Sequence, residues 1–230
     1  GSSTTFPIAE IDSITFSLQG QPPSEGLLAY YPFNGSADDE SGNGHNGTLY
    51  NVNITSDRFG RDGKAYAFQG NSTSYIQTDT SSLLIFSGNS TLAAWVKGTG
   101  TLNDIVRIKG TLNDGIEIGT YSDGTSNSNF SYSGNNWFNI LSNAIINDNG
   151  WHFVVLVVIE NRGELFVDAV SVEDTTASSS FIMTKPAYIS IGRHPIYTSR
   201  AFNGVIDDIR IYNRALSELE IQSLFHEGGW

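Results

Sequence analysis

Hydrophobic and polar residues alternate along the chain in short runs, and clusters of Gly, Asn, Ser and Asp separate these runs. A period of two over about four to eight residues predicts a β-strand, and turn-forming clusters predict tight connections. Many short strands separated by turns favour an all-β fold of two packed sheets. The predicted strands lie in residues 27–33, 66–70, 74–78, 90–97, 104–110, 115–122, 129–133, 137–146, 150–172, 187–193 and 204–213.

Two segments predict more specific structure. Residues 150–172 are typical of a β-hairpin, and residues 160–163 at its tip supply the positive φ angles that hairpin turns need. Residues 215–228 predict the one short helix, because a Ser-x-x-Glu capping box opens it and a glycine follows it. The residues of this segment that are expected to cap the helix, face the core or end the helix are Ser217, Leu219, Glu220, Ile221, Leu224, Phe225 and Gly228.

Length and composition indicate one main domain. The chain has 230 residues, of which 39% are hydrophobic and 16% charged, so one large core can form. Two prolines flanked by Gly, Ser and Gln near residue 22 are typical of a linker. We therefore expect residues 1–24 to form an N-terminal arm and residues 25–230 to form the sandwich domain.

The charge narrows the possible partners. The net charge is −12, and a field of that sign repels nucleic acid and anionic lipid surfaces. It is compatible with neutral partners such as sugars and with divalent cations. With no cysteine, neither a disulfide framework nor a thiolate metal site is possible. No hydrophobic run approaches the roughly 20 residues of a membrane span, so we expect no membrane insertion by this segment.

Residues 39–47 read DESGNGHNG and fit two ligand-binding patterns. The spacing of Gly42, Gly44 and Gly47 matches a dinucleotide-binding turn, but such a turn opens a helix, and here a strand-like segment follows. An EF-hand also fits poorly, because its twelfth position is Tyr50 instead of a bidentate Glu. The clustered carboxylate and amide oxygens still suit a hard cation such as Ca²⁺. The alternative is a solvated turn.

A second acidic position lies in the last predicted strand. Strict alternation places Asp207 on the same face as Ile209 and Ile211, so its carboxylate would point toward the core. A charge that faces inward needs a partner. A metal ion shared with the 39–47 loop is one candidate. The alternative is an ion pair with Arg193, Arg210 or Arg214.

Several spaced motifs together resemble a laminin G-like domain of the concanavalin A-like lectin/glucanase superfamily, in its bacterial form. The matching segments are residues 27–49, 66–70, 90–97, 149–169, 188–193 and 202–221. Their order agrees with the family, and they extend from Gly26 to about Glu227. The resemblance implies a two-sheet antiparallel jelly roll. Two departures are Asp168-Ala169, where the family usually has Asp-Gly, and residues 98–147, which match weakly.

The resemblance also implies a structural Ca²⁺ between the loop after the first strand and the last strand. Carried over to this sequence, it assigns the side chains of Asp39 and Asp207 as metal ligands. Carbonyl groups near Asn43, His45 or Asn46 would complete the site.

Catalysis is not expected. Some members of the superfamily are glucanases with a Glu-x-Asp-x-x-Glu strand, and the nearest match, at Glu10 and Asp12, has Thr15 in the last place. The sequence has neither a Gly-x-Ser-x-Gly elbow nor a His-Glu-x-x-His motif. His152 lies in a strand motif, where a structural role is favoured.

Binding is therefore the expected function. Sugars are held by aromatic faces flanked by amides and carboxylates. Tyr121, Phe130, Tyr132 and Trp137 lie among Asn and Asp residues and are candidate ligand contacts, although packing inside the sandwich is the alternative. We expect a non-catalytic, extracellular or cell-surface module that recognises glycans. The alternatives are a protein-contacting adhesion or spacer domain and, third, a glycoside hydrolase-like enzyme.

Overall fold

The computed structural model describes most of the chain from residue 21 onward. The described residues are 21–81, 84, 86–99, 103–110, 115–120, 125–132, 136–177, 181–183, 186–197 and 199–230. The predicted arm thus lies largely outside the described residues, and its boundary at residue 24 stays a prediction. Pro23 and Glu25 contact the body of the domain, because their carbonyls accept hydrogen bonds from Tyr212 and Arg214.

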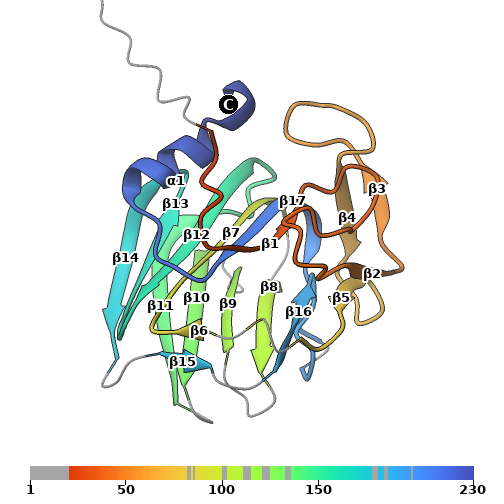
Figure 1. Cartoon of the computed structure of the whole chain (residues 1–230). Helices are drawn as coiled ribbons and strands as arrows, with labels where there is room; N and C mark the ends of the chain where they lie inside the picture. Colours follow the sequence, from red (N-terminus) through yellow and green to blue (C-terminus); the bar gives the residue numbers. More distant parts are fainter. Residues whose placement is uncertain are drawn as a thin grey trace, which may run out of the picture.

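Within the described residues, two antiparallel sheets form the body of the domain (Figure 1). The eight-stranded sheet contains β1 (Leu27–Tyr31), β3 (Asn53–Thr55), β4 (Ala65–Gln69), β7 (Asn89–Gly98), β12 (Trp151–Ile159), β13 (Arg162–Val167), β14 (Val170–Thr176) and β17 (Asn203–Tyr212). The seven-stranded sheet contains β2 (Gly47–Tyr50), β5 (Tyr75–Thr78), β8 (Asn103–Gly110), β9 (Gly115–Thr120), β10 (Thr125–Tyr132), β11 (Asn136–Ile145) and β16 (Ala187–Ile191). A small separate pair contains β6 (Phe86–Ser87) and β15 (Ile182–Met183).

The eight-stranded sheet has the order β14-β13-β12-β7-β17-β4-β3, with β1 beside β17. The seven-stranded sheet has the order β11-β10-β9-β8-β16-β5-β2. Neighbours that are far apart in sequence, such as β7 and β17, are typical of a jelly roll. The predicted all-β, two-sheet antiparallel architecture is confirmed.

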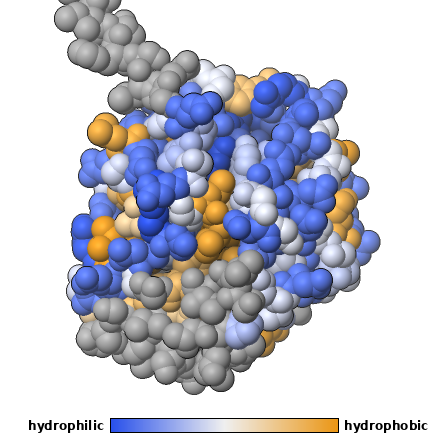
Figure 2. Space-filling view, viewed as in Figure 1, coloured by the Kyte–Doolittle hydropathy of each residue, from blue (hydrophilic) through white to orange (hydrophobic). Residues whose placement is uncertain are grey.

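The main core lies between the two sheets and contains every second residue of the strands. Ala94 and Val96 of β7 and Ile116 and Ile118 of β9 belong to one buried cluster. Because successive strand residues point to opposite faces, Glu117 lies on the outer face of its sheet, away from the core. Figure 2 shows the complementary surface, in which hydrophilic residues cover most of the described area and hydrophobic ones form small patches.

The predicted helix is α1 (Glu218–Phe225), drawn in blue at the top of Figure 1. Ser217 caps it, since its side chain accepts a hydrogen bond from the backbone N–H of Glu220, and the Glu220 carboxylate accepts one from the N–H of Ser217. Ile221 and Leu224 are buried against the outer face of the eight-stranded sheet. The helix ends before Gly228, which lies in a short 3-10 turn, η2 (Glu227–Gly229), with φ of 75°.

One residue of the helix was assigned to the wrong face. Leu219 was expected to point toward the core, but its side chain is 66% exposed. The physical reason is helical periodicity: residues two apart do not share a face, so Leu219 cannot join Ile221.

The predicted hairpin consists of β12 and β13 and is confirmed, with a shorter turn than expected. Ile159 pairs directly with Arg162, so only Glu160 and Asn161 lie in the turn. Glu160 supplies the positive φ, 54°, and Gly163 is already part of β13.

The turn between β13 and β14 keeps its left-handed conformation without glycine. Asp168 and Ala169 have φ of 51° and 61°. The Asp168 carboxylate accepts a hydrogen bond from the N–H of Phe153 (2.9 Å) and bonds Nδ1 of His152 (2.9 Å). Asp148 contacts the other ring nitrogen of His152 at 3.1 Å, and these two carboxylates raise the pKa of His152. His152 thus ties this turn to the start of β12, as a structural residue would.

Candidate functional site

Charged residues gather on the outer face of the seven-stranded sheet. In β8, Arg107 and Lys109 alternate with core residues, and in β9 Glu117 stands between two core isoleucines. Direct pairing of Arg107 with Glu117, and of Asp104 with Gly119, places these side chains on one face. All four charged side chains are buried, which is unusual for their type and requires partners.

Arginines neutralise the two carboxylates of this cluster. Arg107 forms an ion pair with Glu117. Arg200, which follows β16 in the chain, contacts both Asp104 (2.5 Å) and Glu117 (3.2 Å). Burial nevertheless raises the pKa of Asp104 to about 6, against the lowering effect of Arg200 and Arg107. Among the described residues, Oδ2 of Asp104 has no hydrogen-bond partner.

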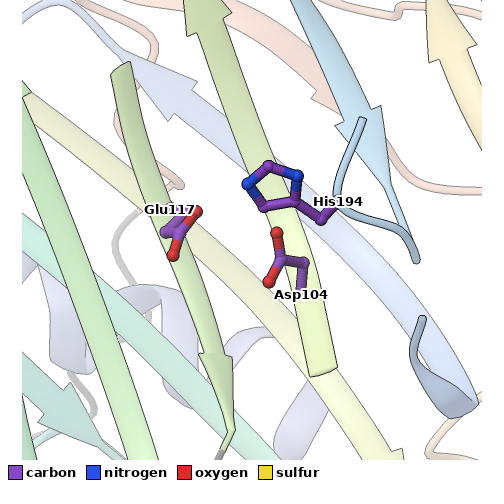
Figure 3. Close-up of side chains that lie close together, drawn as sticks. All are labelled: Asp104, Glu117 and His194. Atoms are coloured by element: carbon purple, nitrogen blue, oxygen red, sulfur yellow. The ribbon is translucent and has the colours of Figure 1, made fainter. Parts of the chain in front are cut away.

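His194 lies above the two carboxylates, on the connection between β16 and β17 (Figure 3). Its Nδ1 accepts hydrogen bonds from the backbone N–H groups of Ile196 (3.0 Å) and Tyr197 (2.8 Å). An acceptor of two N–H bonds cannot itself carry a proton, so the neutral ring is protonated on Nε2. Burial and the nearby Arg107, Arg200 and Lys109 lower the pKa of His194 to about 3, which keeps it neutral at physiological pH.

Asp104, Glu117 and His194 also form a possible metal-binding triad. One ligand atom of each lies within 4.8 Å of the others. A metal ligand must present a bare ring nitrogen, however, and in His194 one nitrogen accepts two backbone N–H bonds while the other holds the proton. Two arginines already supply the positive charge that an ion would bring. The geometry therefore favours a hydrogen-bonding network over a coordination site.

The β16–β17 connection covers this network and presents aromatic and basic groups to solvent. Tyr197 is 62% exposed, and one side of its ring packs against His194, with 4.7 Å between ring centroids. Arg193 stacks on Tyr75 at 3.4 Å and donates a hydrogen bond to the carbonyl of Ser72 (2.7 Å). Tyr75 stacks in turn on Tyr50 of the edge strand β2. Tyr50, Tyr75 and Arg193 thus form a row of stacked side chains, and Arg193 directly precedes His194 in the chain.

A family model of the laminin G type, described as the concanavalin A-like lectin/glucanases superfamily, matches residues 69–222, more than half of the chain. The chain belongs to this superfamily. The comparison of this laminin G-like domain with curated proteins found no match.

Solved structures share the fold of this laminin G-like domain. The binding domain of Paraclostridial Mosquitocidal Protein 1 has a TM-score of 0.70 and 18% identity over 88% of this chain. This chain spans only 52% of that domain. Domain 4 of AbnA, a GH43 extracellular arabinanase from Geobacillus stearothermophilus in complex with arabinotriose, has a TM-score of 0.70 and 21% identity, over 86% of this chain and 97% of that one.

A third similar structure is the ligand-binding domain of botulinum neurotoxin serotype D in complex with N-acetylneuraminic acid. Its TM-score is 0.68 and its identity 15%, over 89% of this chain and 52% of that one. At these identities the likeness establishes the fold alone. Among the described residues of this laminin G-like domain, no helix has the length and hydrophobicity needed to span a membrane.

The structure brings together the predicted metal residues of the 39–47 loop. The carboxylate of Asp39 accepts hydrogen bonds from the N–H groups of Tyr30, Ser41 and His45, each at 2.9 Å. Burial alone would raise the pKa of Asp39, but these N–H groups outweigh it and lower the pKa. The N–H of Asp39 donates to Oδ1 of Asn46 (2.9 Å).

Two further groups of the predicted loop site have protein partners. The carbonyl of His45 accepts the hydroxyl of Tyr31 (2.6 Å). Asn43 donates from its side chain to the carbonyls of Leu27 and Leu28. The loop is therefore held by hydrogen bonds within itself and to β1, and an ion would use the lone pairs that these bonds leave open.

The predicted inward direction of Asp207 is wrong. A β-bulge at Asp208, whose φ is 45°, interrupts the alternation of β17, so Asp207 pairs with Trp95 and shares its outer face. Asp207 is buried there, and its partner is Arg58 at 3.2 Å, which also contacts Asp208 at 2.5 Å. Asp207 therefore forms an ion pair, as the alternative predicted, but its partner is Arg58 and none of the three arginines that the sequence suggested.

The predicted aromatic ligand contacts are only partly covered by the described residues. Tyr121 lies outside them. Phe130 and Tyr132 belong to β10 and Trp137 to β11, where the backbone of Trp137 pairs with Ser131. These strands adjoin β9 in the seven-stranded sheet, and the ligand role of the four residues stays a prediction.

Sequence reasoning missed the buried charged network. No sequence pattern singled out Asp104, Glu117 or His194 as a site residue. The signal was present in the alternation of Arg107, Lys109 and Glu117 with isoleucine and valine, because charges at every second strand position mark the face opposite the core. No comparable sequence pattern indicated the contact between Arg200 and Asp104.

Proposed function

We propose that this laminin G-like domain is a non-catalytic glycan-binding module of an extracellular or surface protein, and that the ligand binds beside Tyr197 on the outer face of the seven-stranded sheet. The observation that carries the proposal is the exposed ring of Tyr197, held in place by His194 above a network of buried charged groups. An aromatic face suits the apolar side of a pyranose, and the neighbouring polar groups suit its hydroxyls.

Family membership and the similar structures support this proposal. Two of those structures are sugar complexes, one with arabinotriose and one with N-acetylneuraminic acid. The AbnA relative is one domain of an extracellular enzyme, which agrees with a module that serves a larger protein.

The buried carboxylates argue against hydrolysis as the main activity. A glycosidase needs two carboxyl groups that reach the scissile bond. Asp104 and Glu117 are only 1% and 2% exposed, and Arg200 contacts both. A substrate on the surface would not reach them without displacing the β16–β17 connection.

A glycan array probed with the parent and with Tyr197→Ala tests the proposal. We expect the parent to bind a defined set of oligosaccharides, and the variant to bind them at least about fivefold more weakly, since loss of a central aromatic contact typically costs more than about 1 kcal/mol. The matched control is Leu219→Ala, because Leu219 is equally exposed but lies on α1.

Three outcomes would contradict this proposal. Binding to surface proteins without binding to any glycan favours the adhesion or spacer alternative. Release of reducing ends from the bound oligosaccharides favours the hydrolase alternative. Equal binding by the parent and Tyr197→Ala places the site elsewhere, with Trp137 and its neighbours as the next candidates.

We further propose that the 39–47 loop holds a structural Ca²⁺ through Asp39 and nearby carbonyls, without Asp207. A carboxylate has about four lone-pair sites, and the hydrogen bonds to Asp39 use three of them. An ion at a hundredfold excess over its Kd stabilises the fold by about 2.7 kcal/mol, or several degrees in Tm at roughly 2–4 °C per kcal/mol.

Thermal melting with Ca²⁺ and with EDTA tests the calcium proposal. The expected result is a calcium-dependent rise in Tm that Asp39→Asn loses and Asp207→Asn keeps. Asp207 is not needed because its carboxylate forms an ion pair with Arg58. An unchanged Tm of the parent, together with no bound ion in elemental analysis, would show that the loop is held by hydrogen bonds alone.

A further inference from the structure

The outer face of the seven-stranded sheet has a local charge opposite to that of the chain. Its seven strands contain four charged residues, two acidic and two basic. The described part of the β16–β17 connection adds two arginines and no acid. The six charged residues are Asp104, Arg107, Lys109, Glu117, Arg193 and Arg200. Four positive and two negative charges give +2, in a chain whose net charge is −12.

The ion pairs on this face leave the guanidinium of Arg193 without a carboxylate partner among the described residues. Arg107 and Arg200 neutralise Glu117 and Asp104. Arg193 contacts the ring of Tyr75 and the carbonyl of Ser72, and among the described residues no carboxylate lies within ion-pair distance of it. Its position is fixed by these two contacts, so little conformational entropy is lost when it binds an anion.

Backbone contacts within the β16–β17 connection hold Arg193 and Arg200 in the same short segment as Tyr197. The N–H of Arg200 donates to the carbonyl of Tyr197 (2.8 Å), and the backbones of Arg193 and Ala201 form a β-bridge. The Arg200 side chain is 28% exposed, so part of it reaches solvent. A planar guanidinium pairs with a carboxylate through two parallel hydrogen bonds, which makes arginine well suited to acidic ligands.

We propose that the glycan recognised at Tyr197 is acidic, with a carboxylate on a pyranose ring that binds Arg193. This inference rests on the proposed glycan-binding function and narrows its ligand class. The pyranose ring would stack on Tyr197, and its carboxylate would form an ion pair with the guanidinium of Arg193. The remainder of the chain has a net charge of −14, the difference between −12 and +2, and repels an acidic ligand. The attraction between the ligand and Arg193 therefore acts only at short range. Short acidic oligosaccharides should therefore bind better, per site, than long polyanions.

The experiment uses pairs of ligands that differ only in charge. Calorimetry measures the Kd of the domain for trigalacturonate, for sialyllactose and for the methyl ester of each, and the two acids separate uronic from sialic acids. We expect one acidic ligand to bind roughly 10- to 100-fold more tightly than its neutral partner, as for a charge-assisted hydrogen bond. Raising the salt concentration should reduce that preference.

Variants assign the preference to Arg193. Arg193→Gln is expected to abolish the discrimination between the acid and its neutral partner, and Arg193→Lys to restore part of it. Arg162→Gln is the matched control, because Arg162 lies on β13 of the other sheet and is partly exposed. Melting of each variant checks that the fold is kept.

The outcomes separate this inference from the proposed function. Equal affinity for acidic and neutral ligands, lost in Tyr197→Ala, would overturn the acidic preference and leave glycan binding in place. An acidic preference unchanged in Arg193→Gln would overturn the assignment of the charge contact. No binding of any of the four ligands, or of the array, would overturn both proposals.

Discussion

Replacing Arg58 with alanine is expected to lower the free energy of unfolding by about 3–5 kcal/mol, the usual cost of leaving a buried charge without its partner. Arg58 is the shared counter-ion of Asp207 and Asp208, and its side chain is only 2% exposed. Its guanidinium also lies over the rings of Phe59 and Trp95, at 4.6 Å from each. The variant removes both the charge and this packing.

The loss should depend on pH. Burial and the neighbouring Asp208 raise the pKa of Asp207 to about 8, although Arg58 lowers it. The folded state then holds a proton on Asp207 that the unfolded state has released, so stability falls as pH rises between about 4 and 8. Without Arg58 the pKa of Asp207 rises further, so the loss of stability in the variant grows at alkaline pH.

Urea denaturation of Arg58→Ala at pH 5, 7 and 9 measures this effect. The largest loss relative to the parent is expected at pH 9. The control is Arg162→Ala, whose ion pairs with Glu164 and Asp174 are exposed and contribute little. A loss that is equally small for both variants at pH 9 would show that Arg58 does not hold the two carboxylates.

Replacing Trp95 with alanine is expected to have a similar cost, about 3–5 kcal/mol, as for other large aromatic residues in cores. Trp95 is fully buried. Its ring packs against Phe153, Phe225 and Trp230, with centroids 5.1 to 5.5 Å away. Alanine would leave a cavity between the eight-stranded sheet and α1.

Trp95→Phe separates packing from hydrogen bonding. The Nε1 of Trp95 has no hydrogen-bond partner among the described residues, so phenylalanine loses no bond and keeps most of the ring contacts. Urea denaturation should therefore place Trp95→Phe much closer to the parent than Trp95→Ala. Equal losses for the two variants would mean that the indole nitrogen is essential, and would contradict the packing account.

The sequence determined the elements that depend on neighbouring residues. Alternation over short distances predicted the strands, and the capping box at Ser217 and Glu220 predicted where α1 begins. The hairpin of β12 and β13 followed from two hydrophobic runs joined by turn formers. The spaced motifs predicted the superfamily and, with it, the two-sheet architecture.

The tertiary structure decided which charges meet. Arg58 and Asp207 are 149 residues apart, and Arg200 reaches Asp104 of β8 from the connection after β16, so no local pattern links them. The bulge at Asp208 reversed the face of Asp207, because one extra residue shifts a period of two. Local propensity determines where strands and turns form. The partner of a buried charge depends on the packing of the whole chain.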